Sequence, residues 1–224
     1  MADRRTRELA ALRYVGWPPI ACLLLATLVI GIAGITWINS PHWQHNPPAQ
    51  ARDVGTVPAT PSVRPVLLAV PLIDPNRIEI PKLKAEAPIV PVATTKDGEL
   101  DVPLNPKKVG WWRYGAKPGA KRGTAILAGH INFSGVTGSM AHIGKLNPGD
   151  QVNVFGKHNA DNRTEVRFRV TGVRTYHKTA LPYKQIFDQQ SVGRIVIVTC
   201  GGPFNASTGN YRDNIVVFAV PATT

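Results

Sequence analysis

One cysteine of this chain stands where a strand would present a nucleophile. Residues 194–199 read RIVIVT, Cys200 follows, and Gly201 and Gly202 come next. A β-branched strand ending in a thiol holds the sulfur rigidly and leaves it reachable, and the glycines allow a sharp turn and the close approach of another backbone. A small apolar cysteine buried at a strand end explains the same pattern, because cysteine is often buried. The pattern alone leaves both interpretations open.

A histidine and an arginine lie at comparable places along the chain. The small-residue run 124–129, TAILAG, leads into His130, where a strand end would present an imidazole to a cleft as general acid or base. Arg212 lies twelve residues after Cys200 and enters the run 214–220. Its guanidinium stays charged and donates in a fixed fork, so it can hold a developing oxyanion or a peptide carbonyl. Taken singly, each residue also fits an ordinary structural role.

Three other histidines compete with His130 for the role of acid or base. His142 lies on a predicted short helix, and His158 lies in the polar turn 156–164, which favours a solvated side chain. His177 follows a long alternating strand, in a loop that would border a cleft. We prefer His130 because it alone ends a predicted strand of small apolar residues.

Short β-like runs carry these candidate residues. Residues 165–173 alternate apolar and polar side chains, which is typical of a half-buried strand. The predicted strands are 77–80, 87–92, 124–130, 151–155, 165–173, 194–200 and 214–220. Two short helices are predicted at 139–146, with Ser139 as the cap, and at 183–190. Many short strands with few helices predict an all-β sandwich or closed barrel.

The N-terminal part of the chain has a different character. Residues 1–14 are polar and basic, and residues 15–38 carry no charged side chain, which is long enough to span a bilayer. The arginines before this run place its N-terminal end in the cytoplasm and the later domain outside the cell. A cleaved signal peptide is the alternative, but the run exceeds the usual apolar core of such a peptide. Residues 39–75 are rich in Pro, Ala, Thr and Val and predict an extended stalk, which puts the folded domain at 76–224.

Composition narrows the classes of partner. The chain has 224 residues and a net charge of +12, which suits an anionic neighbour. Its lysines and arginines are spread out and form no nucleic-acid motif, so for a domain outside the cell we expect wall polymers or lipid head groups instead. The two cysteines are Cys22, which lies in the apolar run, and Cys200, so no disulfide framework is expected.

Together, these residues resemble the sortase family. A strand ending in Thr199 and Cys200, a histidine at the end of an earlier strand and an arginine opening the last strand are shared features, and the resemblance covers residues 77–220. The segments 198–204, VTCGGPF, and 211–214, YRDN, are similar to the actinobacterial class F subgroup. The resemblance implies an eight-stranded β-barrel with one or two short helices. It implies no metal and no cofactor, because the sequence departs from the class A pattern that accompanies a calcium site.

The resemblance also implies a mechanism and partners. Cys200 would attack the Thr–Gly carbonyl of an LPXTG-like signal on a secreted protein, and an amine from a lipid-linked peptidoglycan precursor or a pilin lysine would resolve the thioacyl enzyme. His130 would act as acid and base, and Arg212 would stabilise the oxyanion. The loop 175–192 matches the family's specificity loop, so the substrate-binding residues expected from it and from the motif are Thr199, Leu181, Tyr183 and Ile186.

Two other classes of protein remain to be weighed. An L,D-transpeptidase would carry its cysteine in a Ser/His-Gly-Cys setting, which is absent. A non-enzymatic wall-binding module on a membrane stalk would have the same overall organisation, but it would tolerate the loss of Cys200 and His130.

Overall fold

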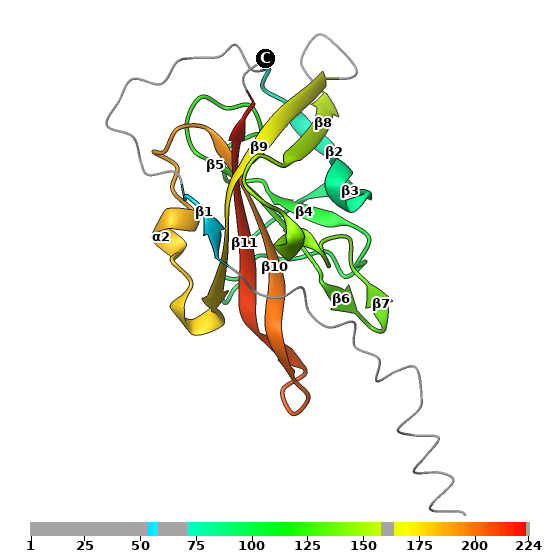
Figure 1. Cartoon of the computed structure of the whole chain (residues 1–224). Helices are drawn as coiled ribbons and strands as arrows, with labels where there is room; N and C mark the ends of the chain where they lie inside the picture. The colour runs from blue at the N-terminus through cyan, green and yellow to red at the C-terminus, as the bar shows by residue number, and fades with distance from the viewer. Residues whose placement is uncertain (1–52, 58–70, 158–163, 223–224) are drawn as a thin grey trace, which may run out of the picture. The chain divides into compact units, whose positions relative to one another are not determined.

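The computed structural model describes residues 53–57, 71–157 and 164–222 (Figure 1). The basic tail 1–14, the predicted membrane anchor 15–38, Cys22 and the turn with His158 lie outside these residues. Within the described ranges no helix is long and apolar enough to cross a membrane.

Eight strands close into a barrel that contains both antiparallel and parallel strand pairs. They follow the order β9-β11-β10-β5-β4-β3-β2-β8, and β8 pairs back onto β9. Their bounds are β2 Asp74–Ile80, β3 Ala85–Val92, β4 Val109–Trp112, β5 Thr124–Gly129, β8 Gln151–Lys157, β9 Thr164–His177, β10 Arg194–Asn205 and β11 Asn210–Pro221. The predicted all-β, eight-stranded barrel is therefore confirmed.

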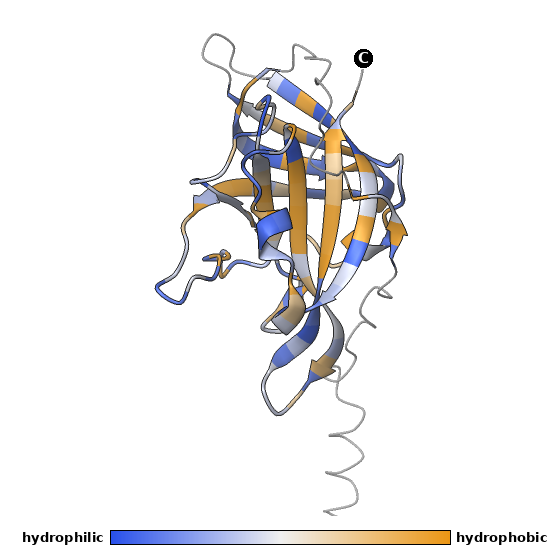
Figure 2. Cartoon of the chain, turned by 90° about the vertical axis from the view of Figure 1, so that its left-hand side faces the viewer, coloured by the Kyte–Doolittle hydropathy of each residue, from blue (hydrophilic) through white to orange (hydrophobic). Residues whose placement is uncertain are grey.

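Apolar side chains pack on both faces of the barrel wall and form two clusters. Inward-facing residues of all the barrel strands form the main core, in which Phe168 is the largest fully buried side chain. On the opposite face of β5, β10 and β11, a second cluster is built around Ile126, Val196 and Phe218 and is covered by the segment between β9 and β10. Figure 2 shows long hydrophobic stretches, in orange, along the strands of the barrel wall. These strands are apolar on both faces because one face fills the barrel and the other supports a loop.

The short elements connect the strands. They are β1 Val54–Gly55, the hairpin of β6 Asn132–Phe133 and β7 Val136–Thr137, the 3-10 turns η2 Pro81–Leu83, η3 Ile143–Lys145 and η4 Lys178–Ala180, and the helix α2 Tyr183–Ile186. The predicted helix at 139–146 is wrong in its first half, which forms turns, and Ser139 does not cap it: its buried hydroxyl has no hydrogen-bond partner among the described residues. The predicted helix at 183–190 ends after one turn, because residues 188–191 form a turn in which Asp188 accepts two backbone N–H bonds.

Part of the segment expected as a stalk packs on the barrel. β1 lies antiparallel to β9, and the Arg174 guanidinium donates to the carbonyls of Val54 (2.7 Å) and Gly55 (2.6 Å). Further along the chain, Ile73 is fully buried and β2 already begins at Asp74. The packed structure therefore extends into the 39–75 region at these two places, while residues 39–52 and 58–70 lie outside the described ranges.

Candidate active site

The strand register brings the three candidate residues together. β5 and β10 are parallel and pair Ile126 with Val196 and Ala128 with Val198, so His130 and Cys200 follow at the same level. β10 and β11 are antiparallel and pair Cys200 with Asn214. Since alternate residues of a strand share a face, Arg212 lies on the same face of β11 as Asn214, and therefore on the same face of the sheet as Cys200 and His130. The structure thus places all three on one face of three neighbouring strands.

Cys200 does not end its strand, contrary to the sequence-based expectation. β10 continues to Asn205, with a break in register between Gly201 and Phe204. Gly201 is needed because a Cβ there would press against the Ile215 side chain. Arg212 is likewise the third residue of β11 and lies inside that strand, whereas His130 directly follows the last residue of β5, as predicted. Cys200 and Arg212 therefore both lie inside the strands of the β10–β11 hairpin.

The Cys200 thiol is largely enclosed. It packs against the small cluster of Ile131, Ala141 and Tyr211. Burial raises the pKa of the Cys200 thiol because the charged thiolate loses hydration, while the Lys178 ammonium, which is within hydrogen-bonding reach of the sulfur, acts in the opposite direction. The resting sulfur therefore favours the neutral thiol, and its attack on a carbonyl requires removal of the proton.

His130 is held by a backbone carbonyl. Its Nε2 lies 3.0 Å from the Pro103 oxygen, and the Phe133 ring lies 5.0 Å from the imidazole centre. A carbonyl oxygen only accepts, so Nε2 carries a proton and Nδ1 is the nitrogen left to exchange one. This is the arrangement that a histidine needs if it is to take a proton and return it at a fixed point.

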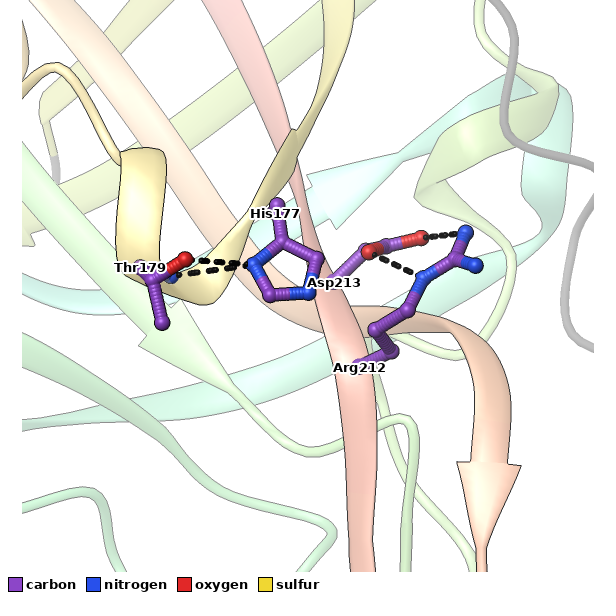
Figure 3. A network of polar contacts seen from close by, with 4 residues as sticks. All are labelled: His177, Thr179, Arg212 and Asp213. Atoms are coloured by element: carbon purple, nitrogen blue, oxygen red, sulfur yellow. Dashed lines mark hydrogen bonds and ion pairs between the residues drawn. The ribbon is translucent and has the colours of Figure 1, made fainter.

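Arg212 is held by the residue that follows it. Its Nε donates to Asp213 Oδ1 (2.8 Å) and its Nη2 donates to Oδ2 (2.9 Å), as Figure 3 shows. The Arg212 side chain is 57% exposed, whereas that of Asp213 is 5% exposed. The hydrogen bond from Arg212 lowers the pKa of the Asp213 carboxyl, its burial acts against this, and the charges of Arg212 and His177 lower the pKa further. The Arg212 side chain is therefore exposed to solvent, while its guanidinium is bound through Nε and Nη2 to the buried Asp213 carboxylate.

The four residues expected to bind substrate lie in three different settings. Thr199 differs from the expectation: it is buried on the opposite face from Cys200, and its hydroxyl donates to the Gly129 carbonyl (2.8 Å), so it ties β10 to β5. Ile186 is fully buried against the outer cluster and Leu181 packs on it, so both shape the loop. Tyr183 is 58% exposed and stands on the same segment, which leaves it the most available for a ligand.

Of the three competing histidines, the structure describes His142 and His177. His142 is exposed before η3. His177 is the last residue of β9, lies opposite Asp213 in the register and accepts from the Thr179 backbone N–H at Nδ1 (3.4 Å). In the described ranges no group of three or more His, Cys, Asp or Glu is placed to hold a metal ion.

Two residues of the site were missed from the sequence, Lys178 and Asp213. Lys178 lies in a loop twenty-two residues before Cys200 and carries no local pattern. The signal for Asp213 was present: an aspartate directly beside a candidate arginine, at the start of an apolar run, faces the interior by strand alternation and so requires a partner.

Removing the Lys178 charge should slow the reaction of Cys200 with iodoacetamide near neutral pH. Lys178→Gln abolishes the interaction that lowers the pKa of the Cys200 thiol, so the pKa rises further and less thiolate is present at a given pH below it. We expect the whole pH profile of alkylation to move to higher pH, with equal rates well above both pKa values. Lys184→Gln, at an exposed position on α2, is the control and should keep the wild-type profile. An unchanged profile in Lys178→Gln would show that the ammonium does not act on the thiol.

A buried arginine anchors the segment that covers the outer apolar cluster. Arg194 is 4% exposed, its Nε donates to Thr124 Oγ1 (3.0 Å), and its Nη2 donates to the Gln185 carbonyl of α2. Its guanidinium stands over the Phe218 ring at 5.7 Å. Burial lowers the pKa of Arg194, and the nearby Asp188 opposes this. One side chain therefore links β5, β10 and the loop that borders the Cys200 face.

Arg194→Met should destabilise the protein markedly. It leaves the Gln185 carbonyl and the Asp188 charge without a buried cation, a change that typically costs about 3–5 kcal/mol of unfolding free energy. Urea denaturation measures the loss. Arg169→Met is the matched control, because the exposed Arg169 also donates to a backbone carbonyl, that of Gly149 (3.0 Å), and should change stability by about 0.5 kcal/mol or less. Equal stability of the two variants would contradict the anchoring role.

Comparison with known proteins gives a consistent result. A model of the sortase domain matches residues 78–222. Sortase C1 from Streptococcus agalactiae, solved in complex with MTSET, is 15% identical, with 66% of this chain and 67% of that chain covered and a TM-score of 0.50. Sortase C-1 from Actinomyces oris is 20% identical, with 68% and 77% covered and a TM-score of 0.50. Sortase C1 from Streptococcus suis is 15% identical, with 67% and 73% covered and the same TM-score. No curated protein sequence matches the chain.

Proposed function

Since the chain belongs to the sortase family of cysteine transpeptidases, we propose that it cleaves an LPXTG-like sorting signal between Thr and Gly and transfers the Thr end to an amine. One observation carries the proposal: Cys200, His130 and Arg212 share one face of three neighbouring strands. A thiol, an imidazole and an exposed guanidinium are the nucleophile, the proton carrier and the oxyanion donor that acyl transfer requires.

In the first half-reaction the Cys200 sulfur attacks the carbonyl carbon of Thr as its proton passes to His130. The new C–S bond pushes the carbonyl electron pair onto oxygen, and Arg212 donates N–H groups to this oxyanion. Collapse of the tetrahedral adduct breaks the C–N bond, and His130 gives its proton to the departing amine of Gly. The product is a thioester between Cys200 and the Thr carboxyl group.

The second half-reaction reverses the proton flow. The acceptor amine attacks the thioester carbonyl and gives its proton to His130. The C–N bond forms, the C–S bond breaks, and the sulfur takes back the proton. Two acyl transfers of modest difficulty replace one displacement at an amide, which is the usual benefit of a covalent intermediate.

Location and partners form the second part of the proposal. The apolar run 15–38 and its flanking arginines support a single-pass anchor, with the N-terminus in the cytoplasm and the barrel outside. There the substrates would be secreted proteins with the sorting signal, and the acceptor would be a lipid-linked peptidoglycan precursor or a pilin lysine. The segments 198–204 and 211–214 support assignment to the class F subgroup.

The test is direct detection of the thioester. The full-length protein with Cys22→Ser, in detergent, is incubated with LPXTG-type peptides and examined by intact-mass spectrometry. We expect a mass increase equal to the acyl part of the peptide, located on Cys200, and its disappearance when an amine is added. If peptide binds without any covalent adduct, the non-enzymatic wall-binding module replaces the transpeptidase.

A further inference from the structure

We propose that Asp213 is a positioning residue for the transpeptidation reaction, which sets the orientation of the Arg212 guanidinium over the Cys200 face. The inference rests on the proposed function. Asp213 is buried on the inner face of β11, while Arg212 extends to the outer face, so the pair joins the two sides of the sheet.

The two hydrogen bonds fix the plane of the guanidinium. A single bond would let the group rotate about the N–H···O axis, whereas the bonds from Nε and Nη2 to the two carboxylate oxygens define one plane. This leaves the N–H groups of Nη1 and the second N–H of Nη2 available. An exposed arginine without such a partner samples many rotamers, which weakens its value as an oxyanion donor.

The surroundings hold the carboxylate in turn. Gly202 has a φ of +70°, and a Cβ at this position would overlap the Asp213 carboxylate, so the space is reserved for that group. His177 lies directly opposite on β9, and its Nδ1 accepts from Thr179, which leaves Nε2 as its N–H nitrogen in the neutral ring. Figure 3 shows the imidazole standing between Thr179 and Asp213. The carboxylate therefore has defined neighbours on β9, β10 and β11.

The geometry predicts a specific pattern of kinetics. Asp213→Asn keeps a similar side-chain shape but loses the negative charge and one acceptor oxygen. The Arg212 guanidinium is then still present, but it is no longer held by two hydrogen bonds. We expect kcat for peptide transfer to fall about 10- to 100-fold, less than a complete loss of an oxyanion donor, with KM changed far less. Asp150→Asn is the control, because Asp150 is also partly buried and paired, with Lys82 at 2.7 Å, but lies on a different part of the barrel.

A double-mutant cycle tests whether Asp213 acts through Arg212. In an Arg212→Ala background, the further change Asp213→Asn should have almost no effect on kcat, since the group that it orients is absent. The alkylation rate of Cys200 and the unfolding midpoint should stay close to wild type in Asp213→Asn. Equal fold-losses in both backgrounds would overturn the proposal, and so would a faster Asp213→Asn enzyme, which would mean that the carboxylate withholds Arg212 from substrate.

A measurement without substrate separates this inference from the function on which it rests. In full-length protein labelled with 15N-arginine, the Nε–H signal of Arg212 should be shifted and protected from exchange, and it should lose both properties in Asp213→Asn but not in Asp150→Asn. An Arg212 signal that does not respond to Asp213→Asn overturns the positioning role. A responsive signal in a protein that transfers no peptide would refute the proposed function while leaving the pairing intact.

Discussion

Replacing Cys200 with alanine is expected to leave a folded protein in which peptide transfer falls on the order of 10⁵- to 10⁶-fold, the scale of losing a catalytic nucleophile. The sulfur has no substitute: the chain has only one other cysteine, Cys22, which lies in the apolar run far from residues 194–205 in sequence. The fold should survive because only one atom is removed from the small cluster of Ile131, Ala141 and Tyr211. Transfer of an LPXTG-type peptide to an amine, followed by chromatography, measures the loss.

The matched control for Cys200→Ala is Cys22→Ala, which should transfer at the wild-type rate. Cys200→Ser should be nearly as inactive as Cys200→Ala, since a hydroxyl is far less acidic and less nucleophilic than a thiol in a site arranged for sulfur. Circular dichroism and the unfolding midpoint separate a chemical defect from misfolding. Residual transfer above about 1% of wild type in a well-folded Cys200→Ala protein would remove the thioester from the mechanism.

His130→Ala is expected to lower the rate of transfer by about 10²- to 10⁴-fold, the usual contribution of a general acid–base. Two proton movements are affected, because the same imidazole must protonate the leaving amine and deprotonate the incoming one. The Pro103 carbonyl fixes Nε2 as a protonated nitrogen, so the defect should concern the proton exchanged at Nδ1. Steady-state kinetics of peptide transfer to an amine measure the loss.

Two further histidine variants accompany His130→Ala. His142→Ala changes an exposed residue before η3 and should keep full activity. His177→Ala removes a neighbour of Asp213 and should have an intermediate effect at most, since Arg212 still holds that carboxylate. Collapse of activity in His177→Ala with near-normal activity in His130→Ala would transfer the acid–base role to His177.

Local sequence pattern was sufficient for most of the barrel. Seven strands are predicted within a few residues of their observed starts, because alternation, β-branched residues or a short continuous apolar run marks each of them. β4, VGWW, was missed since it is four residues long, contains glycine and shows no alternation. β1 was hidden in a Pro-rich segment, and it is a strand only because the edge of β9 and the Arg174 guanidinium supply its partners. Such tertiary partners are invisible to a local pattern.

The position of a candidate residue can be predicted from the sequence where strand alternation decides which face it occupies. Cys200, His130 and Arg212 are candidates from the sequence because each lies at or near an end of a predicted strand, and the observed register then places all three on one face. Thr199 was assigned to the site by its neighbour in the motif, but alternation turns it to the other face, where it bonds Gly129. Lys178 was beyond prediction, since a flexible side chain from a distant loop reaches the sulfur only after the chain has folded.

The hydrogen-bond acceptors that hold His130 and Arg212 differ in how easily a mutation can remove them. His130 is held by the main-chain oxygen of Pro103, and every amino acid at position 103 supplies that oxygen as long as the loop keeps its path. Arg212 is held by the side chain of Asp213, which a single substitution abolishes. Random mutations should therefore disrupt the contact that holds Arg212 much more often than the contact that holds His130. A deep mutational scan would show this as broad tolerance at position 103 beside near-intolerance at position 213.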